Sequence, residues 1–106
     1  MIANTPAPPY YAVIFTSVRT AGDDGYAEMS DIMVNLASKQ DGFLGMESAR
    51  KDIGITVSYW RDQASIKKWR DHIDHAVART KGREEWYKEF KVRIALVERD
   101  YDFQKK

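Results

Sequence analysis

The chain has 106 residues, of which 43% are hydrophobic and 31% are charged, and its formal net charge at pH 7 is +1. These values are typical of one globular domain with an ordinary core rather than of a disordered protein. Charges of both signs alternate without a basic cluster, so no nucleic-acid partner is expected. Cysteine is absent, which excludes disulfides, thiolate catalysis and cysteine-bound metal centres.

The N-terminal segment contains neither a basic cluster nor a long apolar run, so it does not resemble a secretory signal. The three prolines of the chain fall within residues 1–9, which predicts a stiff but flexibly attached leader. The longest apolar stretch, residues 10–15, is too short to span a bilayer. We therefore expect one domain over residues 10–103, in a cytoplasmic protein with no membrane partner.

The N-terminal half predicts a strand followed by a helix. Residues 10–18 are rich in β-branched and aromatic side chains and follow a proline pair, which favours a strand. Apolar residues recur at helical spacing over residues 26–37, and Asp23 or Asp24 can cap the start of that helix.

The C-terminal half predicts a hairpin, a helix and a last strand. Residues 43–51 and 54–60 read as two strands joined by a short turn. Asp62 can cap a second helix. The apolar stripe of that helix consists of Ile66, Trp69, Ile73 and Val77. Residues 81–90 predict further helix after a glycine break, and residues 91–103 predict a long strand.

The element order β-α-β-β-α-β predicts the ferredoxin-like α+β arrangement, a four-stranded antiparallel sheet with both helices on one face. The strands carry apolar residues on both faces, for example Val13 and Phe15 on one and Ala12 and Ile14 on the other. An uncovered apolar sheet face of this size exceeds what monomers tolerate. A two-fold homodimer that packs sheet against sheet would cover it, so we predict a homodimer.

Five short segments occur in an order and spacing shared with a known family. They are GFLG (42–45), YW (59–60), WRDHIDH (69–75), GREEWY (82–87) and RIALVERDY (93–101). With these segments, residues 11–101 resemble the antibiotic biosynthesis monooxygenase family of dimeric α+β barrels. The resemblance implies a small cytoplasmic dimer with a ligand pocket between the helices and the sheet of each subunit.

One branch of this family oxidises aromatic polyketide phenols to quinones without flavin or metal. Its pocket tryptophan at the end of the third strand matches Trp60. Its asparagine four residues earlier falls on Thr56, and its pocket tyrosines fall on Ser48 and Ile66.

A second branch binds and degrades heme. Its helix tryptophan matches Trp69, but its proximal histidine falls on Arg79 and its first-strand asparagine on Phe15. Without an axial imidazole the heme iron lacks its protein ligand, so heme degradation is not expected. The sequence is more similar to family members of unassigned substrate.

Two histidines, His72 and His75, are three residues apart on the second predicted helix and are the candidate general bases. No third metal ligand is evident beside them, so no metal site is expected. On a straight helix His72 flanks the apolar stripe and His75 lies opposite it, in solvent. A helix offset near Ile73 would instead turn His75 inward with Gly82 and Trp86. Both placements of His75 remain open.

Aromatic residues are the candidate substrate-binding groups: Trp60, Trp69, Trp86, Tyr59 and Phe90. Trp69 lies in the middle of the apolar stripe, which predicts a core position. Tyr59 and Trp60 are neighbours on a strand, so only one of them faces the helices, and the sequence does not decide which. Trp86 and Phe90 are four residues apart and are expected to pack together on a helix.

These observations predict a cofactor-independent monooxygenase that oxidises a small aromatic or quinol-like substrate with dioxygen. His75 or His72 would remove a phenolic proton, and the aromatic walls would orient the electron-rich anion for reaction with dioxygen. The alternative is a non-catalytic small-ligand-binding or stress-related dimer of the same fold. Neither hypothesis includes a cofactor.

Overall fold

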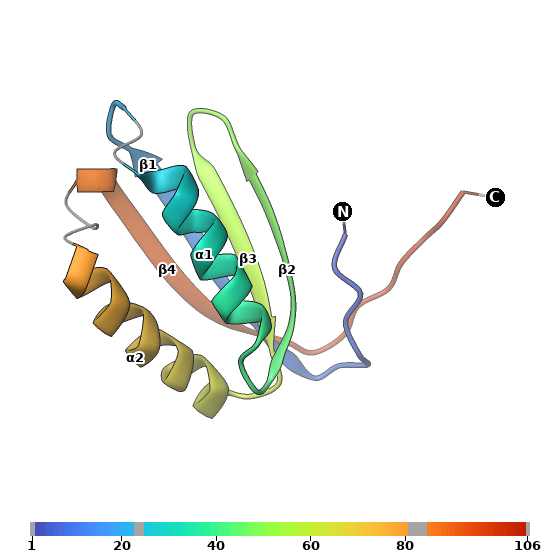
Figure 1. Ribbon diagram of the computed structural model, residues 1–106. Coiled ribbons are helices and arrows are strands. Elements are labelled where there is room, and N and C mark those ends of the chain that lie inside the picture. Colours follow the sequence, from blue (N-terminus) through green and yellow to red (C-terminus); the bar gives the residue numbers. More distant parts are fainter. Residues whose placement is uncertain (1, 23–24, 81–84, 106) are drawn as a thin grey trace.

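A computed structural model describes residues 2–22, 25–80 and 85–105, and of residues 74–80 only the backbone. The elements are β1 (Tyr10–Arg19), α1 (Tyr26–Ser38), β2 (Phe43–Arg50), β3 (Gly54–Trp60), α2 (Gln63–Thr80) and β4 (Tyr87–Val97). Within the described residues, four strands form one antiparallel sheet in the order β2-β3-β1-β4, and both helices lie on one side of it (Figure 1). The predicted ferredoxin-like α+β fold is confirmed.

The last strand begins and ends earlier than the sequence predicts. The helix expected over residues 81–90 is wrong for residues 87–90, which belong to β4, while residues 81–84 lie outside the described part. Residues 87–90 form a strand because β1 is long enough to pair with them, as far as Arg19 opposite Tyr87 and across a bulge. The strand ends at Val97 rather than at residue 103.

The register of the central strand β1 decides which side chains lie under the helices. Tyr11 of β1 pairs with Trp60 of β3 and with Leu96 of β4, and these residues face the helices. Successive residues of a strand point to opposite faces, so Tyr10 and Tyr59 face away from the helices. We call the helix-covered side the inner face and the opposite side the outer face.

The inner face forms four rows that cross the sheet from β2 to β4. They are Phe43-Trp60-Tyr11-Leu96, Met46-Ser58-Val13-Ile94, Ser48-Thr56-Phe15-Val92 and Arg50-Gly54-Ser17-Phe90. The core forms where the helices cover the first of these rows: Ala37 of α1 and Ile66 and Trp69 of α2 are buried together with Trp60.

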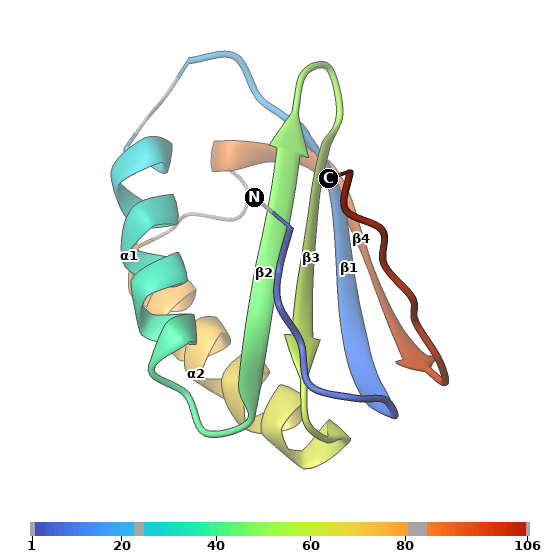
Figure 2. The same ribbon diagram turned by 90° about the vertical axis from the view of Figure 1, so that its right-hand side faces the viewer.

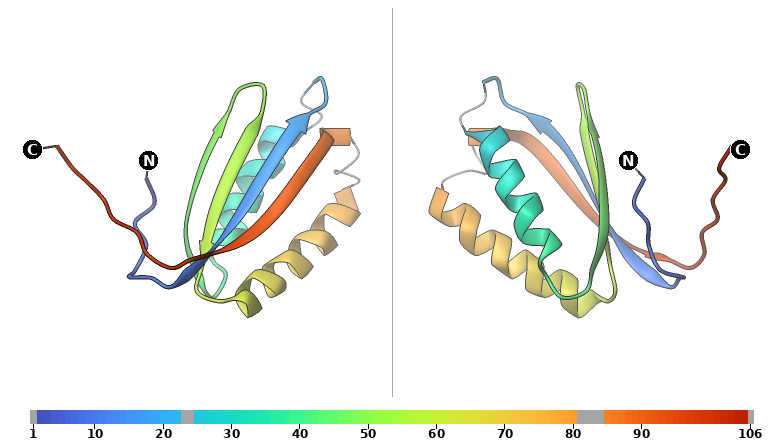
Figure 3. Two further views of the ribbon diagram at one scale, coloured as in Figure 1. Left: turned by 180° about the vertical axis from the view of Figure 1, so that it is seen from behind. Right: turned by 45° about the vertical axis from the view of Figure 1, so that its right-hand side comes forward.

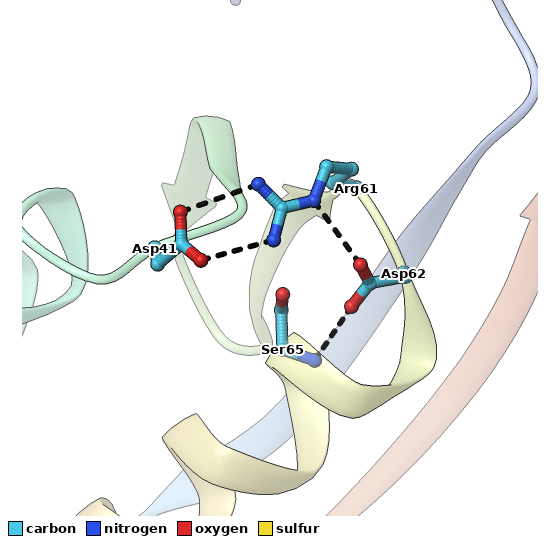
Figure 4. A network of polar contacts seen from close by, with 4 residues as sticks. All are labelled: Asp41, Arg61, Asp62 and Ser65. Atoms are coloured by element: carbon cyan, nitrogen blue, oxygen red, sulfur yellow. Dashed lines mark hydrogen bonds and ion pairs between the residues drawn. The ribbon is translucent and has the colours of Figure 1, made fainter.

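A network of exposed polar contacts holds the start of α2 against the turn that follows α1 (Figure 4). The predicted cap is confirmed, because the Ser65 backbone N–H donates to Asp62 Oδ1 at 2.7 Å. That hydrogen bond is the main reason why the pKa of Asp62 falls to about 2. The Arg61 guanidinium donates to Asp41 at 3.0 and 3.2 Å and to Asp62 at 3.1 Å. These contacts therefore join the start of α2 to the turn that follows α1.

The start of α1 differs from the prediction. The residue at its N-cap position is Gly25, with φ 81°, which has no side chain that could cap the helix. The predicted caps, Asp23 and Asp24, lie outside the described residues.

The leader runs beside β2, and both termini lie on the same side of the sheet (Figure 3). The Ala3 backbone N–H donates to Glu47 Oε2 at 2.8 Å, and the Thr5 hydroxyl donates to the Tyr10 hydroxyl at 3.0 Å. The flexibility of the leader stays a prediction. In the described part of the chain, no helix is both long and apolar enough to cross a membrane.

Replacing Gly42 by alanine should destabilise the fold more than the same change at Gly25. Both glycines have a positive φ, 87° and 81°, which costs a non-glycine residue about 1–2 kcal/mol. A Cβ at Gly42 would also overlap the Ser65 side chain, whereas a Cβ at Gly25 meets nothing within 4 Å. Overpacking adds roughly 1–3 kcal/mol, so urea denaturation should give a total loss of about 2–5 kcal/mol for Gly42→Ala. Equal losses for the two variants would show that the turn does not pack tightly on α2.

Candidate functional site

The inner side of β4 carries apolar side chains that the helices leave half-exposed. Phe90, Val92, Ile94 and Leu96 retain 41%, 47%, 48% and 48% of their accessible surface, whereas Trp60 on the same face retains none. We call these four residues the inner β4 row. The row lies on the sheet edge opposite to β2 (Figure 2), and the core that the helices form with β1, β2 and β3 includes no described residue of β4. The inner β4 row is therefore an apolar surface that can receive a ligand.

A stack of three rings borders one end of this surface. Trp69 of α2 stacks on Trp60 with 6.2 Å between ring centroids, and His72 stacks on Trp69 at 5.6 Å. Phe43 meets Trp60 edge-on at 5.4 Å. The Trp60 indole N–H donates to Ser58 Oγ at 2.9 Å, which satisfies the polar atom of a fully buried ring. This end of the inner face is packed core.

A second aromatic cluster lies at the other end, where β4 begins. Phe15 lies 5.3 Å from Phe90 and 5.5 Å from Tyr87, measured between ring centroids. Tyr26 of α1 lies 5.8 Å from Tyr87 and 6.0 Å from Trp86. Burial raises the pKa of the Tyr87 phenol, and its hydrogen bond to the Tyr26 hydroxyl raises it further. Tyr87 therefore stays protonated at neutral pH and is not a candidate base.

Arginine side chains flank this second cluster. The Arg19 guanidinium carbon lies 3.5 Å from the centre of the Tyr26 ring, and that of Arg50 lies 6.0 Å from the same point. Arg19 also donates to the Trp86 carbonyl at 3.1 Å, and Arg50 donates to the Ser17 hydroxyl. The second cluster is thus aromatic with positive charge at its margin.

The outer face carries a different network, which contains Tyr59. The Tyr59 hydroxyl donates to Glu47 Oε1 at 2.6 Å, and its ring meets Tyr10 edge-on at 5.7 Å. Burial, followed by the bond to Glu47, raises the pKa of Tyr59 to about 12. The bond from Tyr59 and the one from the Ala3 backbone lower the pKa of Glu47. The candidate Tyr59 therefore lies on the opposite face from the candidate Trp60 and cannot line the same surface.

Of the two candidate bases, the structure describes the side chain of His72 but not that of His75. His72 is exposed, and its imidazole stacks on Trp69 at 5.6 Å. It is therefore the last ring of the stack that borders one end of the inner β4 row. The side chain of His75 lies outside the described residues. However, α2 is helical without interruption from Gln63 to Thr80, so the offset expected near Ile73 is absent from the described backbone.

The remaining candidates fall into two groups. Trp60 and Trp69 belong to the core, as predicted for Trp69, while Trp86 and Phe90 belong to the second cluster. Trp86 packs against Tyr26, and Phe90 packs against Phe15. The contact expected between Trp86 and Phe90 assumed a helix, but Phe90 belongs to β4. Sequence reasoning missed four members of this site: Phe15, Tyr26, Tyr87 and Arg50. The alternation of β1 could have indicated Phe15, but the other three come together only through strand pairing.

Comparison with known proteins identifies the family. The model of the family described as antibiotic biosynthesis monooxygenase matches residues 9–92. The chain belongs to this family. It is also 50% identical over 105 residues to the uncharacterized protein YqjZ of Bacillus subtilis, a match that covers 97% of this chain and 92% of that protein.

Solved structures share the fold of this monooxygenase-family chain. PA3566 from Pseudomonas aeruginosa has a TM-score of 0.66 at 17% identity, with 89% of this chain and 97% of that one covered. NE2512 from Nitrosomonas europaea, described as a protein of unknown function, has a TM-score of 0.67 at 11% identity and covers 92% and 97%. Rv0793 from Mycobacterium tuberculosis has a TM-score of 0.63 at 14% identity and covers 90% and 99%. At these identities the likeness shows the fold alone.

Trp69→Ala should lower the free energy of unfolding by about 3–5 kcal/mol, because it removes a buried ring from the core. His72→Ala should lower it by about 1 kcal/mol or less, because the imidazole is exposed and contributes only one stacking contact. Chemical denaturation of both variants measures the difference. A loss for His72→Ala as large as that for Trp69→Ala would contradict this expectation and show that the imidazole contributes to the stability of the core.

Proposed function

We propose that the chain forms a homodimer in which each subunit binds a small aromatic or quinol-like molecule on the inner β4 row and oxidises it with dioxygen. The observation that carries this proposal is the exposure of the row, from 41% to 48% per residue, on the face that the helices otherwise cover. A flat aromatic ligand lying on Phe90, Val92 and Ile94 would bury this surface against Phe15 and Tyr87. Family membership supports oxidation as the reaction.

The composition of the outer face supports the homodimer. Ile14 and Val57 lie next to each other there, and the adjacent Ile55 is 46% exposed. Ala95 of β4 is exposed on the same face. Apolar residues on an uncovered sheet face favour association with a second sheet, and a two-fold axis lets the same surface serve both subunits. A small cytoplasmic dimer is the proposed form.

The proposed reaction needs few groups from the protein. A base removes the phenolic proton, and the electron-rich anion reduces dioxygen while both are held together. One oxygen atom enters the ring to give a quinone, and the other leaves as water with two hydrogens from the substrate. The aromatic walls orient the ring, and His75, or second His72, is the proposed base. No cofactor takes part in this scheme.

Binding without turnover is the second candidate function. Around the inner β4 row, the described side chains with a phenol are Tyr11, Tyr26 and Tyr87, and burial raises the pKa of Tyr87. The described histidine, His72, stacks on Trp69 at one end of the row. If neither histidine is oriented toward the ligand, the row can bind an aromatic molecule without deprotonating it.

Ile94→Asn and Ala95→Asn form a matched pair, because these adjacent residues of β4 face opposite sides of the sheet. Calorimetric titration with 1-naphthol should show roughly tenfold weaker binding for Ile94→Asn, since a polar group replaces apolar ligand contacts. Light scattering should show an intact dimer for that variant. Each Ala95→Asn subunit should bind 1-naphthol with wild-type affinity, but the Ala95→Asn dimer should dissociate into monomers more readily. Wild-type protein should consume oxygen with 1-naphthol, and His75→Ala should bind the ligand without consuming oxygen.

The possible results separate the two candidates. Binding to wild-type protein without oxygen uptake above that of buffer, over a panel of phenols and hydroquinones, would leave the non-catalytic function. Absence of binding to wild-type protein, or equal weakening by the two asparagine variants, would contradict the proposed surface.

A further inference from the structure

The side chain of Arg50 extends from the edge strand β2 inward across the inner face of the sheet. Its side chain passes over Gly54 of β3 and donates a hydrogen bond to the Ser17 hydroxyl of β1, two strands away. Any Cβ at Gly54 would overlap the guanidinium, so glycine at that position makes room for it. The exposed side chain of Arg50 is thereby directed over the middle of the sheet rather than beyond the β2 edge.

The partners of Arg50 among the described residues are neutral. They are the Ser17 hydroxyl and the face of the Tyr26 ring, 6.0 Å from the guanidinium carbon. In the described part of the chain Arg50 forms no ion pair with a carboxylate, unlike Arg61, which contacts both Asp41 and Asp62. A guanidinium carries five N–H donors in a rigid fork that matches a carboxylate. Donors of Arg50 are therefore available for an acidic ligand.

The position of the cation relative to the inner β4 row is fixed by the register. Gly54, Ser17 and Phe90 lie side by side across β3, β1 and β4. Neighbouring strands are about 4.8 Å apart, so a guanidinium that reaches Ser17 lies about one strand spacing from the Phe90 position. Phe90 and Phe15 are in ring contact at 5.3 Å and form the nearest part of the apolar surface. A cation and an aromatic platform are thus within the span of one small molecule.

We propose that the ligand of the inner β4 row is an aromatic carboxylate, whose ring lies on Phe15 and Phe90 and whose carboxylate pairs with Arg50. This inference rests on the proposed function and names the class of its substrate, an aromatic acid that also carries the oxidisable hydroxyl. A neutral aromatic molecule would fill the same surface but would leave the Arg50 donors to water. The carboxylate also fixes which end of the ring points along β4.

Two probes of the same shape test the inference: naphthalene-2-carboxylate and its neutral amide, naphthalene-2-carboxamide. Calorimetric titration of the wild-type protein should show the carboxylate binding about tenfold more tightly, because charge-assisted hydrogen bonds are stronger than neutral ones. Added salt should reduce that ratio, because the pair is partly exposed. Arg50→Gln should weaken carboxylate binding to the level of the amide and leave amide binding unchanged. Arg99→Gln removes the same charge from the exposed segment after β4 and should change neither affinity.

The amide separates failure of this inference from failure of the proposed function. If wild-type protein binds both probes equally, or if Arg50→Gln weakens both alike while Arg99→Gln weakens neither, Arg50 does not select the ligand and the inference is wrong. If wild-type protein binds neither probe, the proposed binding surface is wrong and the inference falls with it. The wild-type ratio and its salt dependence need no variant, so loss of folding in Arg50→Gln would not obscure the answer.

Discussion

The stacking of Trp69 on Trp60 is the contact on which the arrangement of the helix layer depends. Trp60 is the fully buried aromatic residue at the end of β3, and Trp69 brings α2 onto the sheet beside it, 6.2 Å between ring centroids. The Asp41–Arg61–Asp62 contacts hold the same end of α2 at the turn after α1. Because α2 is held near β3, the inner side of the edge strand β4 keeps its half-exposed apolar residues. The exposure of the proposed ligand surface is a consequence of where the core is packed.

Because successive side chains of a strand point to opposite faces, the two faces of the sheet carry different residues. On β4, Ile94 faces the helices and Ala95 faces away, and the other residues follow the same pattern. A strand that contacts the proposed ligand on one side and the proposed second subunit on the other needs apolar side chains on both. The central strand β1 shows this pattern, whereas the outer side of β4 carries Lys91 and Arg93 before Ala95 and Val97. The outer face also holds the Tyr59–Glu47 pair and the leader near β2, so the part of it left open for a partner centres on Ile14 and Val57.

Sequence reasoning succeeded where the information is local and failed where it depends on pairing. The order of elements predicted the fold, the cap at Asp62 predicted the start of α2, and the apolar stripe placed Trp69 in the core. The choice between Tyr59 and Trp60 needed the register with β1, which a single strand does not contain. The spacing of Trp86 and Phe90 suits a helix in isolation, but pairing with β1 satisfies the backbone of residues 87–90 instead. The cluster around Arg50 and Tyr26 likewise exists only once β1, β2 and β4 are in place.

The central claim, that the inner β4 row receives the ligand, is tested most directly by methyl NMR spectra recorded during titration with 1-naphthol. The methyl groups of Val92, Ile94 and Leu96 should shift progressively as ligand is added, because an aromatic ring lying on them changes their magnetic environment. Those of Ile55 and Val57, on the outer face, should stay in place. Shifts confined to Ile55 and Val57, or saturation of binding without any change at Val92, Ile94 and Leu96, would contradict the claim.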